Sequence, residues 1–162
     1  MARIYISLGS NIDRAANTRA GVEALREAFG ELQLSSVYES EAVGFEGDAF
    51  YNMVIACDTD LGVHQANRVL GDIEDANGRD RSGPRFSSRT LDLDLLLYDD
   101  LVLDENGLRL PREEILKNAF VLWPLAEIAP ELQHPATGET FSALWERFDK
   151  SRENLTPIEF AL

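Results

Sequence analysis

The chain has little lysine and a single cysteine. Lys117 and Lys150 are the two lysines among 162 residues, and the rest of its 15 basic residues are arginines. Its 29 acidic residues give a net charge of −14, which argues against general binding to nucleic acid or to anionic membranes. A single Cys57 excludes an intrachain disulfide, and the apolar run at residues 53–57 predicts that this cysteine is a small buried hydrophobic residue.

Long hydrophobic runs are also missing. No apolar stretch approaches the ~18 residues that a membrane span needs, and the N-terminal residues MARIYISLGS lack the pattern of a signal peptide. The contents of 44% hydrophobic and 27% charged residues are typical of globular proteins. We therefore expect a cytoplasmic monomer with one domain over residues 1–162, ending in a polar tail from about residue 151, with no nucleic-acid or membrane partner.

The spacing of apolar residues predicts an α+β fold. The expected order is strand, helix, two strands, helix and strand, which is the βαββαβ core of a ferredoxin-like domain with an antiparallel sheet. An added hairpin, a helical turn and a C-terminal helix follow. The predicted strands are residues 2–8, 32–38, 50–57 and 91–98; the predicted helices are residues 18–29, a segment from Asp60 or Gly62 to Ala76, and residues 141–148; the hairpin turns at residues 105–107 and the helical turn lies within 111–118.

The stretch SRTLDLDLLLY at residues 88–98 alternates in character, as a strand with one buried face does. One face is expected to carry Leu91, Leu93, Leu95 and Leu97, and the other Asp92, Asp94, Leu96 and Tyr98. The two acids would then lie on the same face with Cα atoms roughly 6–7 Å apart. Neighbouring like charges repel unless a cation lies between them, and Mg²⁺ is usually held by one or two carboxylates plus substrate phosphates. The stretch therefore predicts a metal site at Asp92 and Asp94; the alternative is a solvated strand face.

Four arginines come just before this strand, in a segment without periodicity that contains glycine, proline and serine. They are Arg79, Arg81, Arg85 and Arg89. Guanidinium groups bind phosphate oxygens through paired hydrogen bonds, so the segment predicts a loop that closes over a polyphosphate. A solvated basic loop is the alternative.

A set of aromatic residues and one amide lies near these elements: Phe50, Asn52, Phe86 and Phe120. Aromatic residues usually belong to the core, but Phe86 lies in a polar loop and Phe50 starts a strand beside Asn52. Aromatic rings can sandwich a flat heterocycle, and a carboxamide can both donate to it and accept from it. His64 and His134 have no ligand-like spacing, and we expect them at the surface.

Three phrases together resemble the 6-hydroxymethyl-7,8-dihydropterin pyrophosphokinase family of folate biosynthesis. They are IYISLGSN, SRTLDLDLLLY and FVLWPLAEIAPEL, and the similarity runs from the N-terminus to about Thr140. The resemblance implies a ferredoxin-like α+β fold. It also implies that Mg-ATP donates its terminal pyrophosphoryl group to the hydroxymethyl oxygen of the pterin, leaving AMP.

The resemblance implies roles for individual residues. Asp92 and Asp94 would hold two Mg²⁺ ions and act in catalysis with Arg79 and Arg89. The pterin would be bound by Gly9, Ser40, Val43, Phe50, Asn52, Phe86 and Phe120. The nucleotide would be bound by Glu74, Arg81, Arg85, Leu108, Arg109, Arg112 and Lys117.

The chain departs from the family pattern on the ATP side. Ser87-Ser88 replaces a frequent Gly-Pro, Arg112 replaces a histidine, and Asn118 replaces an arginine, with Lys117 beside it. Two alternatives stay open. Gly9-Ser10 with a distant D-x-D also fits a nucleotidyltransferase, and the departures are compatible with a non-catalytic pterin- or nucleotide-binding module.

Overall fold

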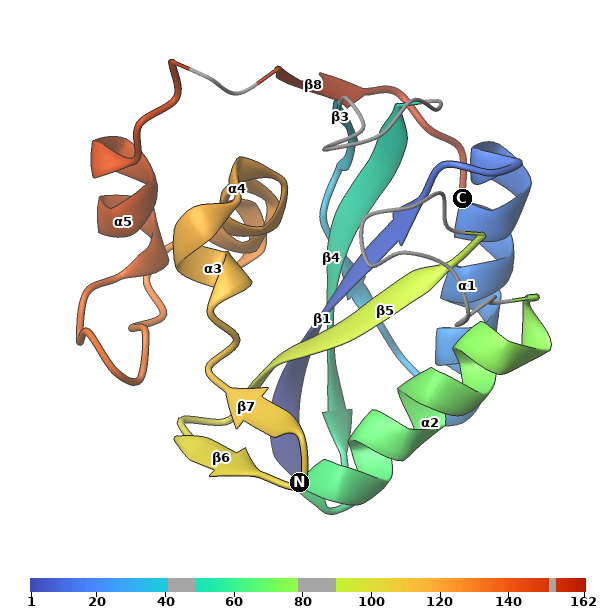
Figure 1. Cartoon of the computed structure of the whole chain (residues 1–162), viewed down its shortest axis with the longest axis horizontal. Coiled ribbons are helices and arrows are strands. Elements are labelled where there is room, and N and C mark those ends of the chain that lie inside the picture. Colours follow the sequence, from blue (N-terminus) through green and yellow to red (C-terminus); the bar gives the residue numbers. More distant parts are fainter. Residues whose placement is uncertain (41–48, 79–89, 152–153) are drawn as a thin grey trace.

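The computed structural model describes residues 1–40, 49–78, 90–151 and 154–162. The element order along the chain is β1-α1-β2-β3-β4-α2-β5-β6-β7-α3-α4-α5-β8 (Figure 1). The strands are β1 (Ala2–Ser10), β2 (Gln33–Leu34), β3 (Val37–Ser40), β4 (Phe50–Thr59), β5 (Asp92–Tyr98), β6 (Leu103–Glu105), β7 (Leu108–Leu110) and β8 (Leu155–Ile158). The helices are α1 (Arg14–Phe29), α2 (Val63–Ala76), α3 (Glu114–Lys117), α4 (Ala119–Ile128) and α5 (Phe141–Arg147).

The main sheet has the strand order β5-β1-β4-β3-β8, and β2 also pairs with β4. All of its pairings are antiparallel. Helix α1 connects β1 to β3, and β4 lies between these two strands in the sheet. Helix α2 connects β4 to β5, and β1 lies between these two strands. These are two interleaved split βαβ units, so the predicted ferredoxin-like α+β core is confirmed.

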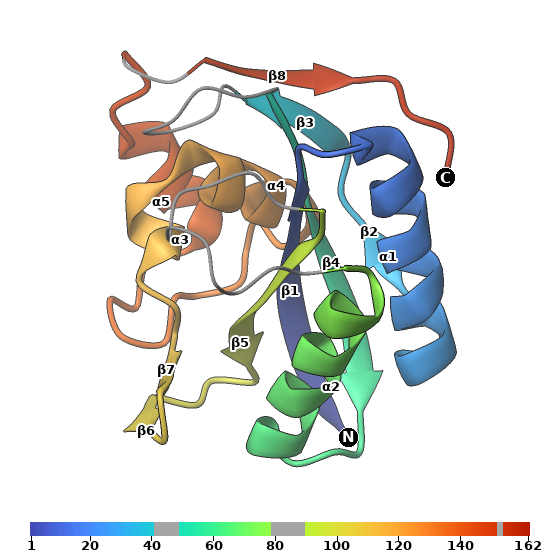
Figure 2. The same ribbon diagram turned by 45° about the vertical axis from the view of Figure 1, so that its right-hand side comes forward.

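Helices cover both faces of the sheet (Figure 2). On one side, α1 and α2 enclose a core that includes Ile6, Val22 and Leu70. On the other side, α4 and α5 enclose a second core that includes Val54 and Phe141. The sheet therefore separates two apolar layers, and alternate residues of each strand face one or the other.

Strand β5 departs from strict alternation. Leu91, Leu93 and Leu95 lie in the first core as predicted, but the pairing with β1 shifts between Tyr5, opposite Leu97, and Ile6, opposite Leu95. The extra residue, Leu96, forms a β-bulge. Leu97 therefore packs into the second core, and Tyr98 packs against the first, so the predicted faces of these two residues are wrong.

Four other predictions need correction. Strand β1 extends to Ser10, beyond the predicted end at residue 8. The strand predicted over residues 32–38 is broken into β2 and β3. The polar tail contributes β8, which pairs with β3 at the sheet edge. His134 is buried, with 3% of its surface exposed.

The hairpin, the helical turn and the buried cysteine are confirmed. Asn106 and Gly107 both have positive φ, as a tight hairpin turn between β6 and β7 requires. Cys57 is fully buried, which raises the pKa of its thiol to about 11.

In the described parts of the chain, none of the helices combines the length and apolar character that crossing a membrane requires.

Candidate functional site

One row of residues crosses the sheet near the C-terminal end of β1. Gly9 pairs with Asp92 of β5 on one side and with Asn52 of β4 on the other. The alternation of each strand directs Asp92 and Asn52 to the face covered by α4. Neighbouring strands are ~4.8 Å apart, so the two backbones lie roughly 10 Å from each other. Because Gly9 has no side chain, the row leaves space between an acid and an amide.

The amide end of this row is crowded. Asn52 is buried and donates to Ser40 Oγ at 2.7 Å. A Cβ atom on Gly9 would lie 3.3 Å from Asn52 Oδ1 and 3.7 Å from Phe50 Cδ1. The structure therefore brings together four of the residues predicted to bind the pterin: Gly9, Ser40, Phe50 and Asn52.

Arg14, which sequence reasoning missed, holds the neighbouring backbone. Its guanidinium donates to the carbonyl oxygen of Ala49 at 2.9 Å and lies 2.9 Å from Glu39 Oε2. It also lies over the ring of Tyr51, 4.1 Å from its centroid. The residues on both sides of segment 41–48 are thus fixed to the start of α1. Nothing in the local sequence distinguishes Arg14 from a surface arginine.

Asp94 follows Asp92 on the same face of β5 and is 30% exposed. Burial raises the pKa of Asp94 to about 7, and the negative charges of Asp92, Glu74 and Glu114 act in the same direction. The Arg112 guanidinium lowers this pKa, but by less than the other groups raise it. The acid pair therefore lies in a strongly negative environment that favours a cation.

Within the described part of the chain, Arg112 is a charged group that contacts Asp94 from outside the sheet. Its backbone N–H donates to the carbonyl oxygen of Leu96 at 3.1 Å. Its Nη2 lies 3.2 Å from Asp94 Oδ1, and its Nε donates to Glu114 Oε2 at 2.5 Å. The sequence predicted a nucleotide ligand here; the structure places Arg112 against a predicted metal ligand. Glu114 was missed, because its proximity to Asp94 depends on how the hairpin returns to the sheet.

Glu74 lies at the last turn of α2 and is buried. Its Oε2 accepts a hydrogen bond from the backbone N–H of Leu93 at 2.9 Å. Leu93 lies between the two acids, so Glu74 fixes the edge of β5 at the site. Its predicted contact with the nucleotide stays a prediction.

The chemistry of the acid pair fits a hard divalent cation, because carboxylate oxygens are the ligands that Mg²⁺ prefers. Among residues 1–40, 49–78, 90–151 and 154–162, no group of three or more His, Cys, Asp or Glu side chains has a geometry that could hold a metal ion by itself. A metal at Asp92 and Asp94 would therefore need further ligands, such as water or phosphate oxygens.

Phe120 lies in the first turn of α4, is half-buried and packs against the second core. A carboxylate farther along this helix, Glu127, anchors α4 to the sheet and was missed. It accepts hydrogen bonds from Tyr38 Oη at 2.6 Å and from Ser36, whose N–H lies 3.0 and 3.1 Å from its two oxygens and whose Oγ lies 2.9 Å away. Tyr38 pairs with Asn52, so Glu127 connects α4 to the amide end of the row. The signal in the sequence was a lone acid in an apolar helix.

The other predicted nucleotide ligands that are described do not touch the acid pair. Leu108 is buried in the first core. Arg109 and Lys117 each lie 3.4 Å from Glu113 Oε2. Six predicted site residues lie outside the described residues: Val43, Arg79, Arg81, Arg85, Phe86 and Arg89.

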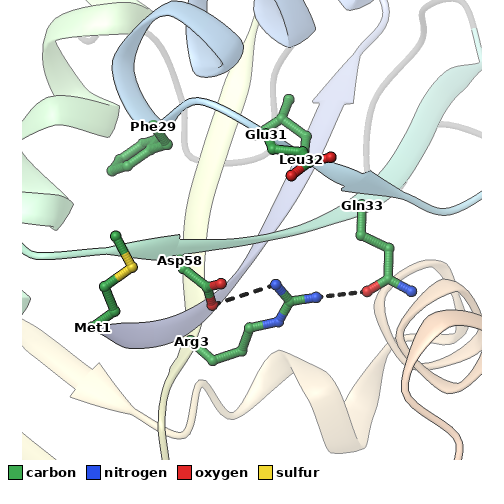
Figure 3. A pocket seen from close by; sticks show the side chains of 7 residues that line it. All are labelled: Met1, Arg3, Phe29, Glu31, Leu32, Gln33 and Asp58. Carbon is green, nitrogen blue, oxygen red and sulfur yellow. Dashed lines mark hydrogen bonds and ion pairs between the residues drawn. The ribbon is translucent and has the colours of Figure 1, made fainter.

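A cavity of about 430 Å³ lies at the opposite end of the sheet from this row. Figure 3 shows Arg3 there between Asp58, 3.4 Å away, and Gln33, 2.7 Å away. Its guanidinium is thus engaged by this chain's own side chains. The cavity is separate from the acid pair and contains none of the predicted site residues.

The fold and the row of Asp92, Gly9 and Asn52 together define a small ferredoxin-like α+β protein with an acid pair on an edge strand. The same fold occurs in the crystal structure of Plasmodium falciparum HPPK-DHPS wild type with SDX-DHP, with a TM-score of 0.70 and 14% identity over 91% of this chain. A second structure, Plasmodium falciparum HPPK-DHPS A437G with STZ-DHP, has a TM-score of 0.71. This chain spans 43% and 45% of those longer chains, and the likeness shows the fold alone.

The family model for 7,8-dihydro-6-hydroxymethylpterin-pyrophosphokinase (HPPK) matches residues 5–130. Proteins named 2-amino-4-hydroxy-6-hydroxymethyldihydropteridine pyrophosphokinase are similar over most of their length. The protein from Pseudomonas aeruginosa is 38% identical over 140 residues, which cover 82% of this chain and 84% of that protein. The one from Methylorubrum extorquens is 38% identical over 155 residues, covering 93% of this chain and 96% of that protein. This chain belongs to the HPPK family.

Proposed function

We propose that this chain transfers the terminal pyrophosphoryl group of ATP to the hydroxymethyl oxygen of 6-hydroxymethyl-7,8-dihydropterin, giving AMP and the pterin diphosphate. Family membership supports the reaction. The observation that carries the assignment to this site is the row in which Gly9 separates Asp92 from Asn52. It offers a charged end for the nucleotide and an amide end for the pterin.

At the charged end, Asp92 and Asp94 would hold the Mg²⁺ that accompanies ATP, and two ions are proposed. Bound Mg²⁺ would neutralise the phosphate oxygens and orient them. Glu74 fixes the strand that carries both acids through the Leu93 amide. Arg79, Arg81, Arg85 and Arg89 are proposed to bind phosphate oxygens, and Arg79 and Arg89 to stabilise the charge that develops during transfer. Leu108, Arg109, Arg112 and Lys117 complete the proposed nucleotide set.

At the amide end, Asn52 would read the edge of the pterin while Phe50 and Phe120 stack on its faces. Gly9 and Ser40 would line the pocket, with Val43 and Phe86 added from segments outside the described residues. The Asn52–Ser40 hydrogen bond of 2.7 Å fixes the orientation of the amide before the pterin arrives. Such preorganisation reduces the entropy cost of binding.

The transfer itself requires the hydroxymethyl oxygen to attack the β-phosphorus in line with the oxygen that bridges to the α-phosphorus. The new O–P bond forms as that bridging bond breaks, the hydroxyl proton is released to solvent, and the bridging oxygen leaves with AMP. The protein contributes position and charge stabilisation, and no covalent intermediate is needed.

Turnover of 6-hydroxymethyl-7,8-dihydropterin with Mg-ATP, followed by AMP formation, tests the proposal. We expect one AMP and one pterin diphosphate for each ATP consumed. Release of pyrophosphate in place of AMP would point to a nucleotidyltransferase. Pterin binding without turnover would point to a non-catalytic module.

A further inference from the structure

Arg112 has an unusual position for a residue meant only to bind a nucleotide. Its backbone is fixed on the edge of β5 by the 3.1 Å hydrogen bond to the Leu96 carbonyl, two residues after Asp94. Its side chain then lies between two acids, 3.2 Å from Asp94 Oδ1 and 2.5 Å from Glu114 Oε2. The guanidinium therefore occupies space beside an oxygen of a proposed metal ligand.

This contact has an electrostatic consequence. A guanidinium stays charged at every accessible pH, so Arg112 is a permanent counter-ion to the carboxylates around it. A divalent cation entering beside Asp94 would meet a positive charge a few ångströms away. Two like charges at such a distance repel strongly where burial limits screening by water. The cation and Arg112 thus compete for the same carboxylate.

A nucleotide would change this balance. Phosphate oxygens accept paired hydrogen bonds from a guanidinium, so a bound triphosphate offers Arg112 an alternative partner next to the acids. The bond from Nε to Glu114 holds one edge of the guanidinium in place. A pivot of the whole planar guanidinium about this bond would carry its Nη groups from Asp94 to a phosphate while the side chain stays at the site.

We infer that Arg112 makes metal binding depend on the nucleotide: it neutralises Asp94 while the site is empty of nucleotide, and it leaves Asp94 to the metal when phosphate oxygens become available. The inference rests on the proposed function, because it assumes a metal–nucleotide site at Asp92 and Asp94. Arg112 thereby acts as a specificity residue that favours the metal–nucleotide complex over the free metal.

Titration of the free protein with Mn²⁺, followed by electron paramagnetic resonance, measures this competition without any turnover. Arg112→Gln keeps the backbone bond to Leu96 but removes the charge, so we expect it to bind Mn²⁺ at least about tenfold more tightly than the wild type. Arg68→Gln, on the exposed face of α2, changes the net charge equally and should stay within about twofold.

The double variant Arg112→Gln/Asp94→Asn tests whether the increase in Mn²⁺ affinity arises at Asp94. Its Mn²⁺ affinity should return to the wild-type value or below. The order of the two affinities should reverse when the ligand is Mg²⁺ with a non-hydrolysable ATP analogue. Arg112→Gln should bind this complex about tenfold more weakly than the wild type, because the phosphates lose a guanidinium partner.

Three results would overturn the inference: Mn²⁺ affinity of Arg112→Gln equal to that of the wild type, no measurable Mn²⁺ binding by the variant, or a gain that survives Asp94→Asn. The pterin turnover assay separates these failures from failure of the proposed function. If the wild type turns over the pterin but Arg112→Gln binds Mn²⁺ no more tightly than the wild type, the inference alone is refuted. If the wild type is inactive but Arg112→Gln shows the expected increase in Mn²⁺ affinity, the proposed function alone is refuted.

Discussion

The carboxylates of Glu127 and Asp94 lie on the same side of the sheet but differ in the charge of the groups around them. Glu127 accepts hydrogen bonds from Ser36 and Tyr38, all of them from neutral donors of this chain. Asp94 instead lies among other acids, touches a guanidinium at 3.2 Å, and has its pKa raised to about 7. The first carboxylate is satisfied by the folded chain, whereas the negative surroundings of the second favour a cation.

We interpret Glu127 as a structural acid and propose Asp94 as a functional one. Glu127 is exposed, but its neutral donors include the buried Tyr38, so the contact favours one packing arrangement of α4 on the sheet. Crowding carboxylates together costs free energy of folding, which the contact with Arg112 offsets in part and a bound cation would offset further. We therefore expect substitutions at the two sites to affect different quantities: activity at Asp94 and stability at Glu127.

Asp94→Asn should have the largest effect. It removes the charge that the metal and nucleotide require, and we expect AMP formation to fall by about 10³-fold or more. The melting temperature should stay the same or rise, since one of several crowded negative charges is lost. The control is Asp104→Asn on the exposed part of β6, which should keep normal turnover. A normal rate in Asp94→Asn would contradict the metal role.

Glu127→Ala should reverse this pattern. It leaves the Tyr38 hydroxyl and the Ser36 amide without their acceptor, and we expect a loss of about 2 kcal/mol in the free energy of unfolding. Denaturant unfolding measures the loss, and turnover per folded molecule should fall far less than in Asp94→Asn. Glu131→Ala, at an exposed position after α4, is the control. If Glu127→Ala kept its stability but lost turnover, the contrast between the two acids would disappear.

Gly9→Ala probes the space between the two ends of the row. The added methyl would lie 3.3 Å from Asn52 Oδ1, so the amide must shift, and we expect pterin affinity to fall about tenfold in a fluorescence titration. Gly62→Ala is a matched control, because a Cβ there meets nothing within 4 Å. Unchanged pterin affinity in Gly9→Ala would remove the pterin from this row.

His134 should give the smallest effect, on stability alone. Burial lowers its pKa in the folded chain, so the unfolded chain binds the proton more readily, and stability falls as the pH drops below about 6.5. His134→Asn keeps an acceptor for the amides of Ala136 and Thr137, which now donate to Nδ1. Unfolding measured between pH 8 and pH 5 should show a shallower decline in the variant, and an identical decline would contradict this account.

The sequence predicted the parts of the molecule that depend on local pattern. Alternation around Asp92 and Asp94 predicted their common face, and the order of elements predicted the ferredoxin-like core. The bulge at Leu96 was unpredictable because it arises from the register with β1. Strand β8 was missed because it is short, contains Pro157 and lies at an edge, where proline is tolerated.

The surroundings of the site were predicted less completely than the fold, because they depend on contacts between distant parts of the chain. Arg112 was predicted as a nucleotide ligand, but its contact with Asp94 was not, and the contact of Glu127 with Ser36 was missed; no periodicity encodes such sequence separations. The surface position expected for His134 was wrong for the same reason, because its burial depends on the packing around Phe141. A lone acid in the apolar helix α4 was the one local sign of such a contact.

The central claim is that Asp92 and Asp94 bind the nucleotide through a divalent cation. Isothermal titration of a non-hydrolysable ATP analogue, with and without Mg²⁺, tests it most directly in the wild type and in the double variant Asp92→Asn/Asp94→Asn. The account predicts Mg²⁺-dependent binding in the wild type and a loss of at least about 100-fold in the double variant. Equal, Mg²⁺-dependent binding by both proteins would contradict it.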